Sequence, residues 1–332
     1  MRTRPLVSVV ATALLFSMLS CSCLQDCLAQ TSPQAQDAAT ALRVQTNQPP
    51  FDELELFAFC AGGPMDSYVR HVVQQRGTSF TPDSTFIASF PTTSFQSVLK
   101  SIKPRTSETP SRSREQAYQL LGEAWDAQRN GRYATADEGY RKALQLAPNS
   151  ATLHSAYAHS LLFSKNYPRA EAEARQSLQL WSENADAHAM LALSLTAQKQ
   201  FVDAEAESRE ALRIFPQQHS AMLALAVSLT HLQKYNEAIP FLQKIMPVLP
   251  NVSELRKLMG ISLIETGEVD VGIDQLNSYV KAVPENAEGH YYLGVGLRMK
   301  GSSAEAHAQF AEAFRLQPNN PQYEAATHPP EK

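Results

Sequence analysis

The feature that most constrains the fold of this chain is a 34-residue pattern that repeats six times without insertion or deletion. Counted from Ala117, the eighth place of every unit holds a small residue: Ala124, Ala158, Ala192, Ala226, Gly260 and Gly294. The thirty-second place holds proline in five units and Ser182 in the remaining one. A fixed period of about 20 to 50 residues is typical of a solenoid, in which copies of one supersecondary unit stack on each other.

The apolar residues inside one unit predict two helices. The first stripe of the third unit consists of His188, Leu191, Ala192 and Leu195. These residues share one face because a helix returns every ~3.6 residues. After a break at Lys199 and Gln200, the second stripe consists of Ala204, Ser208, Ala211 and Leu212. Small residues at places 8 and 20 let the two helices approach closely, so each unit is predicted to be a helical hairpin.

This pattern resembles the tetratricopeptide repeat family over residues 117–320. The six units are 117–150, 151–184, 185–218, 219–252, 253–286 and 287–320. The resemblance implies an all-α fold, a right-handed superhelical solenoid of helical hairpins. The seventeenth place carries an aromatic wedge in four units, at Tyr133, Tyr167, Phe201 and Tyr235. Glu123 at the seventh place and Ser303 at the seventeenth depart from the family pattern, so looser packing is predicted in the two end units.

The amino terminus predicts export. Arg2 and Arg4 precede an apolar run from Leu6 to Leu19 that is too short to cross a bilayer. We therefore expect residues 1–29 to be a signal peptide, with the mature chain starting at Gln30. An alternative is lipidation at Cys21, which follows an imperfect lipoprotein box and would tether the chain to a membrane; an uncleaved anchor is a third reading. The expected location is the periplasm, the cell envelope or the exterior.

Between the signal and the repeats the composition changes twice. Residues 30–50 are polar and predict a flexible tether, whereas 51–103 predict a small domain of three or four short helices. Residues 104–116 form a linker and 321–332 a tail. Cys60 lies in an apolar run and is interpreted as a buried small hydrophobe. Cleavage of the signal would leave it alone, without a disulfide framework.

Charge and motifs argue against several classes of function. The repeats carry 18 basic and 22 acidic residues, a net charge of −4. The sequence shows no basic stripe, so nucleic acid is not predicted as a partner. The sequence has no phosphate-binding loop and no serine or zinc hydrolase motif, which indicates a protein that is not an enzyme and needs no cofactor. His154, His188 and His290 share the fourth place of their units. Equivalent side chains in adjacent repeats are separated by two packed helices of about 8–10 Å each, which is too far for the ligands of one metal ion. A structural role is therefore predicted for these histidines.

The strongest indication of function is an apolar inner face. In the family that the chain resembles, places 2, 5, 6, 9, 12 and 13 of each first helix line a concave groove. The candidates are Trp125, His159, Leu162, Phe163, Met190, Leu193, Leu223, Val227, Ile261, Ile264, Tyr291, Tyr292, Val295 and Met299. They predict binding of an apolar or amphipathic segment of another protein. In an alternative, places 6 and 9 partly pack between neighbouring first helices. Lys257 has the residue type of a carboxylate clamp, but Ile261 stands where asparagine is needed, so that clamp is not predicted.

Other hypotheses follow from the same sequence. If Cys21 is lipidated, the chain resembles the six-repeat lipoproteins, or pilotins, that help to build outer-membrane secretion pores. Residues 51–103 could instead fill the groove in cis. Pro240 and Pro247 in the second helix of the fourth unit predict a soft joint. The last helix offers Phe310, Ala313, Phe314 and Leu316 to a next unit that is missing, which predicts a weak homodimer through the C-terminal repeat.

Overall fold

The computed structural model describes residues 93–102 and 112–328, together with 51, 56, 72–74, 77, 78, 82, 84 and 87. The chain divides into two compact units, the first containing residues 1–200 with 206–221 and the second residues 201–205 with 222–332. The predicted signal, the tether, Cys21 and Cys60 lie outside the described residues.

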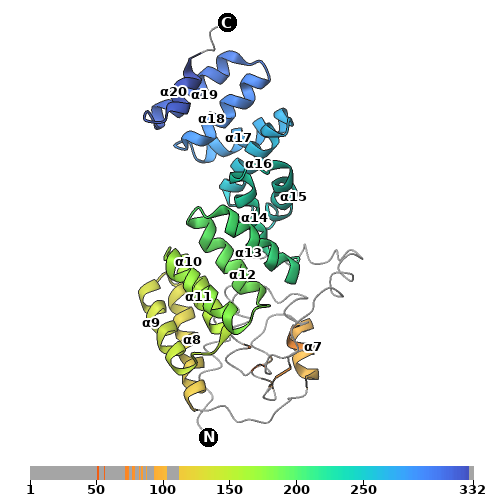
Figure 1. Cartoon of the computed structure of the whole chain (residues 1–332), viewed down its shortest axis with the longest axis vertical. Coiled ribbons are helices and arrows are strands. Elements are labelled where there is room, and N and C mark those ends of the chain that lie inside the picture. Colours follow the sequence, from red (N-terminus) through yellow and green to blue (C-terminus); the bar gives the residue numbers. More distant parts are fainter. Residues whose placement is uncertain are drawn as a thin grey trace. The chain divides into compact units, whose positions relative to one another are not determined.

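The described repeats consist of paired helices joined by three-residue turns (Figure 1). The first helices of the six hairpins are α8 (Arg112–Arg129), α10 (Ala151–Phe163), α12 (Ala185–Ala197), α14 (His219–His231), α16 (Ser253–Glu265) and α18 (Ala287–Met299). The second helices are α9 (Tyr133–Leu146), α11 (Tyr167–Leu180), α13 (Phe201–Ile214), α15 (Tyr235–Ile245), α17 (Val269–Ala282) and α19 (Ser303–Leu316). Helices α7 (Thr93–Ser101) and α20 (Pro321–Thr327) lie outside the repeats. The predicted all-α fold and helical hairpins are confirmed.

The turn inside every hairpin closes through one left-handed residue. This residue occupies place 15 in all six repeats, at Gly131, Lys165, Lys199, Gln233, Gly267 and Gly301, with φ between 59° and 92°. In the second repeat, the backbone N–H of Asn166 donates to the carbonyl of Leu161 across this residue at 2.9 Å. Such a bond satisfies a carbonyl at the helix end. Three of the six turns therefore hold a non-glycine residue in a conformation that favours glycine.

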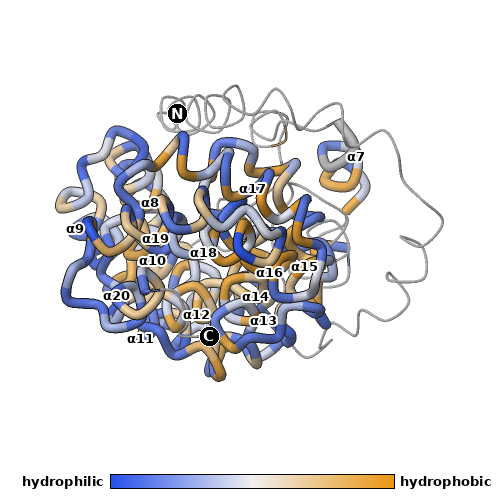
Figure 2. Tube along the Cα trace, turned by 90° about the horizontal axis from the view of Figure 1, so that it is seen from above, coloured by the Kyte–Doolittle hydropathy of each residue, from blue (hydrophilic) through white to orange (hydrophobic). Residues whose placement is uncertain are grey.

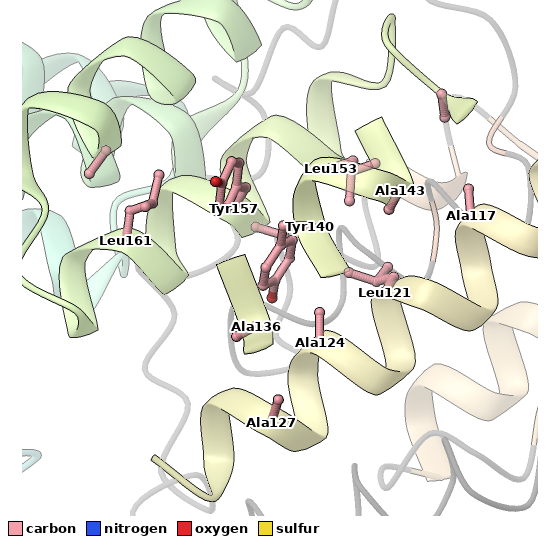
Figure 3. Packing of buried hydrophobic residues seen from close by; sticks show 13 residues of the cluster. Ala117, Leu121, Ala124, Ala127, Ala136, Tyr140, Ala143, Leu153, Tyr157 and Leu161 are labelled. Carbon is pink, nitrogen blue, oxygen red and sulfur yellow. The ribbon is translucent and has the colours of Figure 1, made fainter. Parts of the chain in front are cut away.

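The two helices of a hairpin touch at places 8 and 20, as predicted. In the fifth repeat both places are glycine. A Cβ built on Gly260 would lie 2.6 Å from Cγ of Leu276 and 3.0 Å from the carbonyl oxygen of Gly272. The backbones of α16 and α17 are therefore in direct contact there. Figure 3 shows the alanine version of this packing in the first repeat, where Ala124 and Ala136 are buried between α8 and α9.

The first repeat is joined to the second by an aromatic and polar link. The rings of Tyr140 and Tyr157 stack at 5.2 Å (Figure 3). The Tyr157 hydroxyl donates to Asp137 at 2.5 Å, and Arg169 contacts both of these residues, lying 2.8 Å from Asp137. Glu123 is exposed, while Leu121 and Ala124 on either side of it are buried in the core of the first repeat.

The segment before the repeats packs at the ends of second helices. Its buried residues are Phe51, Leu56, Val72, Val73, Ile87 and Leu99. They form one cluster with Trp181, Ile214 and Phe215 at the carboxyl ends of α11 and α13. The ring of Phe51 meets Trp181 edge-on at 6.4 Å. The described residues of 51–103 thus lie against these helix ends, and none of the cluster's members is a predicted groove residue.

The fourth repeat has a short second helix. Helix α15 ends at Ile245 and has 11 residues, whereas the other five second helices have 14. Pro240 lies inside it and Pro247 follows its end. A proline removes a backbone donor and its ring crowds the carbonyl four residues earlier. Pro247 therefore gives a physical reason for the early end.

The end of the last repeat is covered by α20 to a greater extent than the sequence predicts. Tyr323 of α20 is buried against Ala287 and Ala313, and its ring lies 5.1 Å from that of Tyr291. Phe310 is buried inside the hairpin, where it packs against Gly294 of α18, whereas Phe314 and Leu316 are half-buried beside Tyr323. The expectation of a largely uncovered last helix was therefore wrong.

Hydropathy separates the two kinds of repeat helix. The trace of α9 and α11 is largely hydrophilic, whereas that of α14 is largely hydrophobic (Figure 2). In α10 and α12, most residues are buried. First helices such as α10 and α16 are enclosed by neighbours, because each packs against its own hairpin partner and against helices of neighbouring repeats in the same compact unit. Within the part of the chain that is described, no helix has the length and apolar character to span a membrane.

Candidate functional site

The predicted inner-face residues in the first of the two compact units, residues 1–200 with 206–221, differ in exposure. Phe163, at the end of α10, is 54% exposed. Four others are half-buried: Trp125, His159, Leu162 and Leu193. Met190 is buried, so it forms part of the core and offers no surface to a ligand. This result agrees with the alternative in which place 6 packs between helices.

His159 and Phe163 form an aromatic pair on α10. Their rings meet edge-on at 4.9 Å, one helical turn apart. Burial lowers the pKa of His159 to about 4. The imidazole is therefore neutral at physiological pH and acts as an aromatic side chain beside Phe163.

Two predicted groove residues of the second compact unit, residues 201–205 with 222–332, are also part of the core. Ile261 and Ile264 are buried in the cluster that includes Leu276 and Phe310. The expectation that Ile264 faces a ligand was wrong for a physical reason. Cβ atoms built on Gly272 and Gly296 would lie 2.7 and 2.6 Å from Ile264, so this side chain fills the space that the two glycines leave.

The other predicted groove residues of the second compact unit reach the surface. Met299, the last residue of α18, is 56% exposed. Five are half-buried: Leu223, Val227, Tyr291, Tyr292 and Val295. Met299 and Phe163 occupy the same place, the thirteenth, in their repeats. In these two repeats, place 13 of the first helix therefore exposes a large apolar side chain.

A small cavity lies beside Tyr291, Tyr292 and Val295. Its volume is about 250 Å³, and its remaining lining residues are Gln233, Tyr235, Glu265, Arg298 and Gln322. The amide of Gln322 donates to the Tyr291 hydroxyl at 2.9 Å, which fixes one wall. Sequence reasoning named only the apolar members. Arg298 and Glu265 occupy places 12 and 13 of their first helices, so the family pattern could have found them.

Carboxylates influence the phenols of this cavity. Burial is the main cause that raises the pKa of Tyr292, and Tyr235, Glu288 and Glu265 raise it further. Burial and Glu265 likewise raise the pKa of Tyr235, against a hydrogen bond from Tyr292 that lowers it. Both phenols therefore stay neutral and serve as hydrogen-bonding and aromatic groups.

Lys257 is a structural cation. Its ammonium lies 2.6 Å from both Glu254 and Glu288, and the side chain is buried. Burial disfavours the charged form, but these two carboxylates hold the pKa of Lys257 above its usual value. The ammonium is thus occupied in joining α16 to α18.

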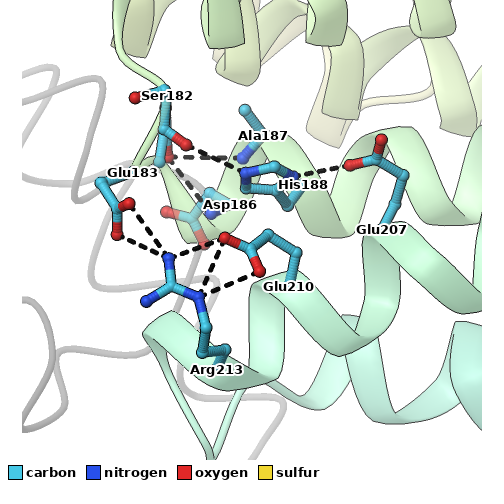
Figure 4. A network of polar contacts seen from close by, with 9 residues as sticks. Ser182, Glu183, Asp186, Ala187, His188, Glu207, Glu210 and Arg213 are labelled. Carbon is cyan, nitrogen blue, oxygen red and sulfur yellow. Dashed lines mark hydrogen bonds and ion pairs between the residues drawn. The ribbon is translucent and has the colours of Figure 1, made fainter. Parts of the chain in front are cut away.

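The three histidines at place 4 brace their repeats. In each case Nδ1 faces the side chain at place 23, at 2.7 Å from Glu173, 2.6 Å from Glu207 and 2.7 Å from Gln309. Nε2 lies 2.9–3.0 Å from the carbonyl at place 32 of the preceding repeat. Figure 4 shows the example of His188 between Glu207 and Ser182. One imidazole therefore connects two helices and the preceding loop.

Beside this brace, Arg213 bridges Glu183 and Glu210 (Figure 4), with its closest contacts at 2.9 and 2.7 Å. Within the described ranges, no group of three or more His, Cys, Asp or Glu residues could hold a metal ion.

The comparisons agree with the paired helices and the closely packed small residues. Sequence profiles described as "Tetratricopeptide repeat" match residues 156–219, 195–261 and 257–321. The chain belongs to the tetratricopeptide repeat family. Among curated proteins, no relative matches this tetratricopeptide repeat sequence.

Solved structures share the fold. PilF of Pseudomonas aeruginosa is 19% identical with a TM-score of 0.51, over 65% of this chain and 98% of that chain. The APC/C hetero-tetramer Cut9–Hcn1 is 15% identical with a TM-score of 0.51, over 65% and 43%. YrrB, described as a TPR protein with an unusual peptide-binding site, is 24% identical with a TM-score of 0.48, over 57% and 98%. At these identities the likeness shows the fold alone.

Proposed function

We propose that this chain is a non-enzymatic interaction scaffold whose first helices bind an apolar or amphipathic segment of a partner protein. The observation that carries the proposal is the exposure of Phe163 and Met299 at the same place of two repeats. Half-buried apolar side chains surround each of them on the same helices. Apolar groups that stay exposed in this way mark interaction surfaces, and an amphipathic helix or strand fits such a surface.

The test is capture of a partner from an envelope extract on immobilised full chain. Phe163→Glu and Met299→Glu should each reduce capture, because a carboxylate would be placed against the apolar segment. Val202→Glu and Val271→Glu are matched controls. These valines are 68% and 50% exposed but lie on second helices. Equal loss in the controls, or full capture by both first-helix variants, would refute the proposal.

The place of action is part of the proposal. An apolar run after Arg2 and Arg4 supports export, with Gln30 as the first mature residue. The specific alternative is a lipid-anchored assembly factor of the cell envelope, which the box before Cys21 supports. Intact mass of the native protein separates these routes, because an acylated Cys21 adds the mass of its lipid. Retention of Met1 would contradict both.

A weak homodimer through the C-terminal repeat is less favoured than the sequence suggested, because Tyr323 of α20 packs against Ala287 and Ala313. We therefore propose a monomer as the binding species. Sedimentation at increasing concentration tests this assignment, and a dimer that Tyr323→Asp strengthens would overturn it.

A further inference from the structure

The cavity on the second compact unit has the size of one side chain. Its volume of about 250 Å³ lies below the range of about 300–1,000 Å³ that is usual for drug-sized ligands. Tyr235, at the start of α15, and Tyr292 of α18 are among its lining residues. Met299 follows Val295 by four residues on α18, so the apolar surface continues along the helix from the cavity.

Two charged residues line this cavity, Glu265 and Arg298, and they differ in their engagement. The guanidinium of Arg298 lies over the ring of Phe310 at 5.1 Å. Glu265 is exposed at the end of α16. Among the ion pairs of the described residues, neither of the two has a partner of opposite charge. Glu265 is therefore the lining charge that remains available to a ligand.

The surroundings add negative rather than positive potential. The ammonium of Lys257 is balanced by Glu254 and Glu288. Glu265 and Glu288 both act on the phenols of Tyr235 and Tyr292. Tyrosine faces attract cations through the ring quadrupole, by about 0.5–2 kcal/mol depending on desolvation. A cation between these rings and Glu265 would satisfy both kinds of group.

We infer that this cavity receives one arginine or lysine side chain of the partner segment, held between Tyr235, Tyr292 and the carboxylate of Glu265. The inference rests on the proposed function and narrows it: the bound segment carries a basic residue and, near it, an apolar residue that contacts Met299. Arg298 remains over Phe310 and lies at the edge of the site.

Four labelled peptides of the form Ala-Leu-Ala-X-Ala-Leu-Ala test this inference by fluorescence anisotropy with the full chain. X is arginine, lysine, norleucine or glutamate. We expect the arginine and lysine peptides to bind about tenfold more tightly than the norleucine peptide. Glu265→Gln should reduce this preference to about twofold or less. Glu268→Gln, which removes an exposed acid three residues away and outside the lining, should leave it unchanged.

The outcomes separate this inference from the proposed function. If all four peptides bind equally and Met299→Glu abolishes binding, the scaffold function stands and the basic pocket is wrong. If the glutamate peptide binds best and Arg298→Gln removes that preference, Arg298 sets the charge and the inference is overturned. If none of the peptides binds at millimolar concentration, the pocket is refuted, and the capture experiment alone then decides the scaffold function.

Discussion

Asp186 is a carboxylate whose burial opposes folding at neutral pH. It lies in the first turn of α12, where Asn184 caps the helix by accepting from the backbone N–H groups of Asp186 and Ala187. Burial raises the pKa of Asp186 from 3.8 to about 6, although a hydrogen bond from the Gln218 amide lowers it in part. The folded state therefore binds a proton more tightly than the unfolded chain does.

The sign of the pH dependence follows from this difference. Between pH 3.8 and about 6 the folded chain holds more protons than the unfolded chain, so stability falls as the pH rises through this window. Each pH unit corresponds to about 1.4 kcal/mol, which gives an upper limit of about 3 kcal/mol above pH 6. Because Asp186 keeps partial contact with solvent, we expect a cost of about 1–2 kcal/mol.

Asp186→Asn removes this cost and keeps the acceptor for Gln218. We expect the variant to be more stable than the wild type by about 1–2 kcal/mol at pH ~7.5, and the gain to vanish as the pH approaches ~4. Urea denaturation followed by circular dichroism at several pH values measures the difference. Asp203→Asn is the control, because Asp203 lies exposed in the first turn of α13. A gain that is the same at both pH values, or a loss at pH ~7.5, would refute the reasoning.

Three further predictions concern the repeats. Gly260→Ala should destabilise the chain by about 1–2 kcal/mol in urea denaturation, since contact of the new Cβ with Leu276 and the Gly272 carbonyl outweighs the better helix propensity of alanine; a stabilised variant would contradict the close packing. Lys199→Gly should stabilise by up to about 1 kcal/mol, because φ at this position is 62°; a lower urea midpoint would contradict this. Amides of 238–249 should exchange faster than those of 204–215, since α15 contains Pro240 and ends early, and equal protection would remove the soft joint.

The period allowed most of the repeat architecture to be predicted. Each hairpin follows from small residues at places 8 and 20 and from the break near Lys199, because these are local features of one unit. Helix α20 was missed although its start signals are present: Asn320 accepts from the N–H of Gln322, and Pro321 follows it. These two residues are a recognisable helix start.

The candidate site was harder to predict, because it depends on contacts between elements. Ile264 is buried since Gly272 and Gly296, on two other helices, leave room for it. The cavity combines residues from four helices and one turn, among them Tyr235, Glu265 and Gln322. The apolar places of the first helices predict neither the charged residues of the cavity nor its polar wall. The exposed fraction of the side chain distinguishes Phe163 and Met299 from core residues such as Met190, and the sequence does not give this fraction.

The most direct test of the account is photo-crosslinking at the exposed apolar positions. A benzophenone amino acid in place of Phe163 or Met299, in the full chain exposed to its native extract, should give a covalent adduct with a partner protein. The same group in place of Val202 or Val271, which are equally accessible on second helices, should give none. Adducts restricted to the first-helix positions support the binding surface. Adducts from Val202 and Val271 alone, with none from Phe163 or Met299, would contradict it.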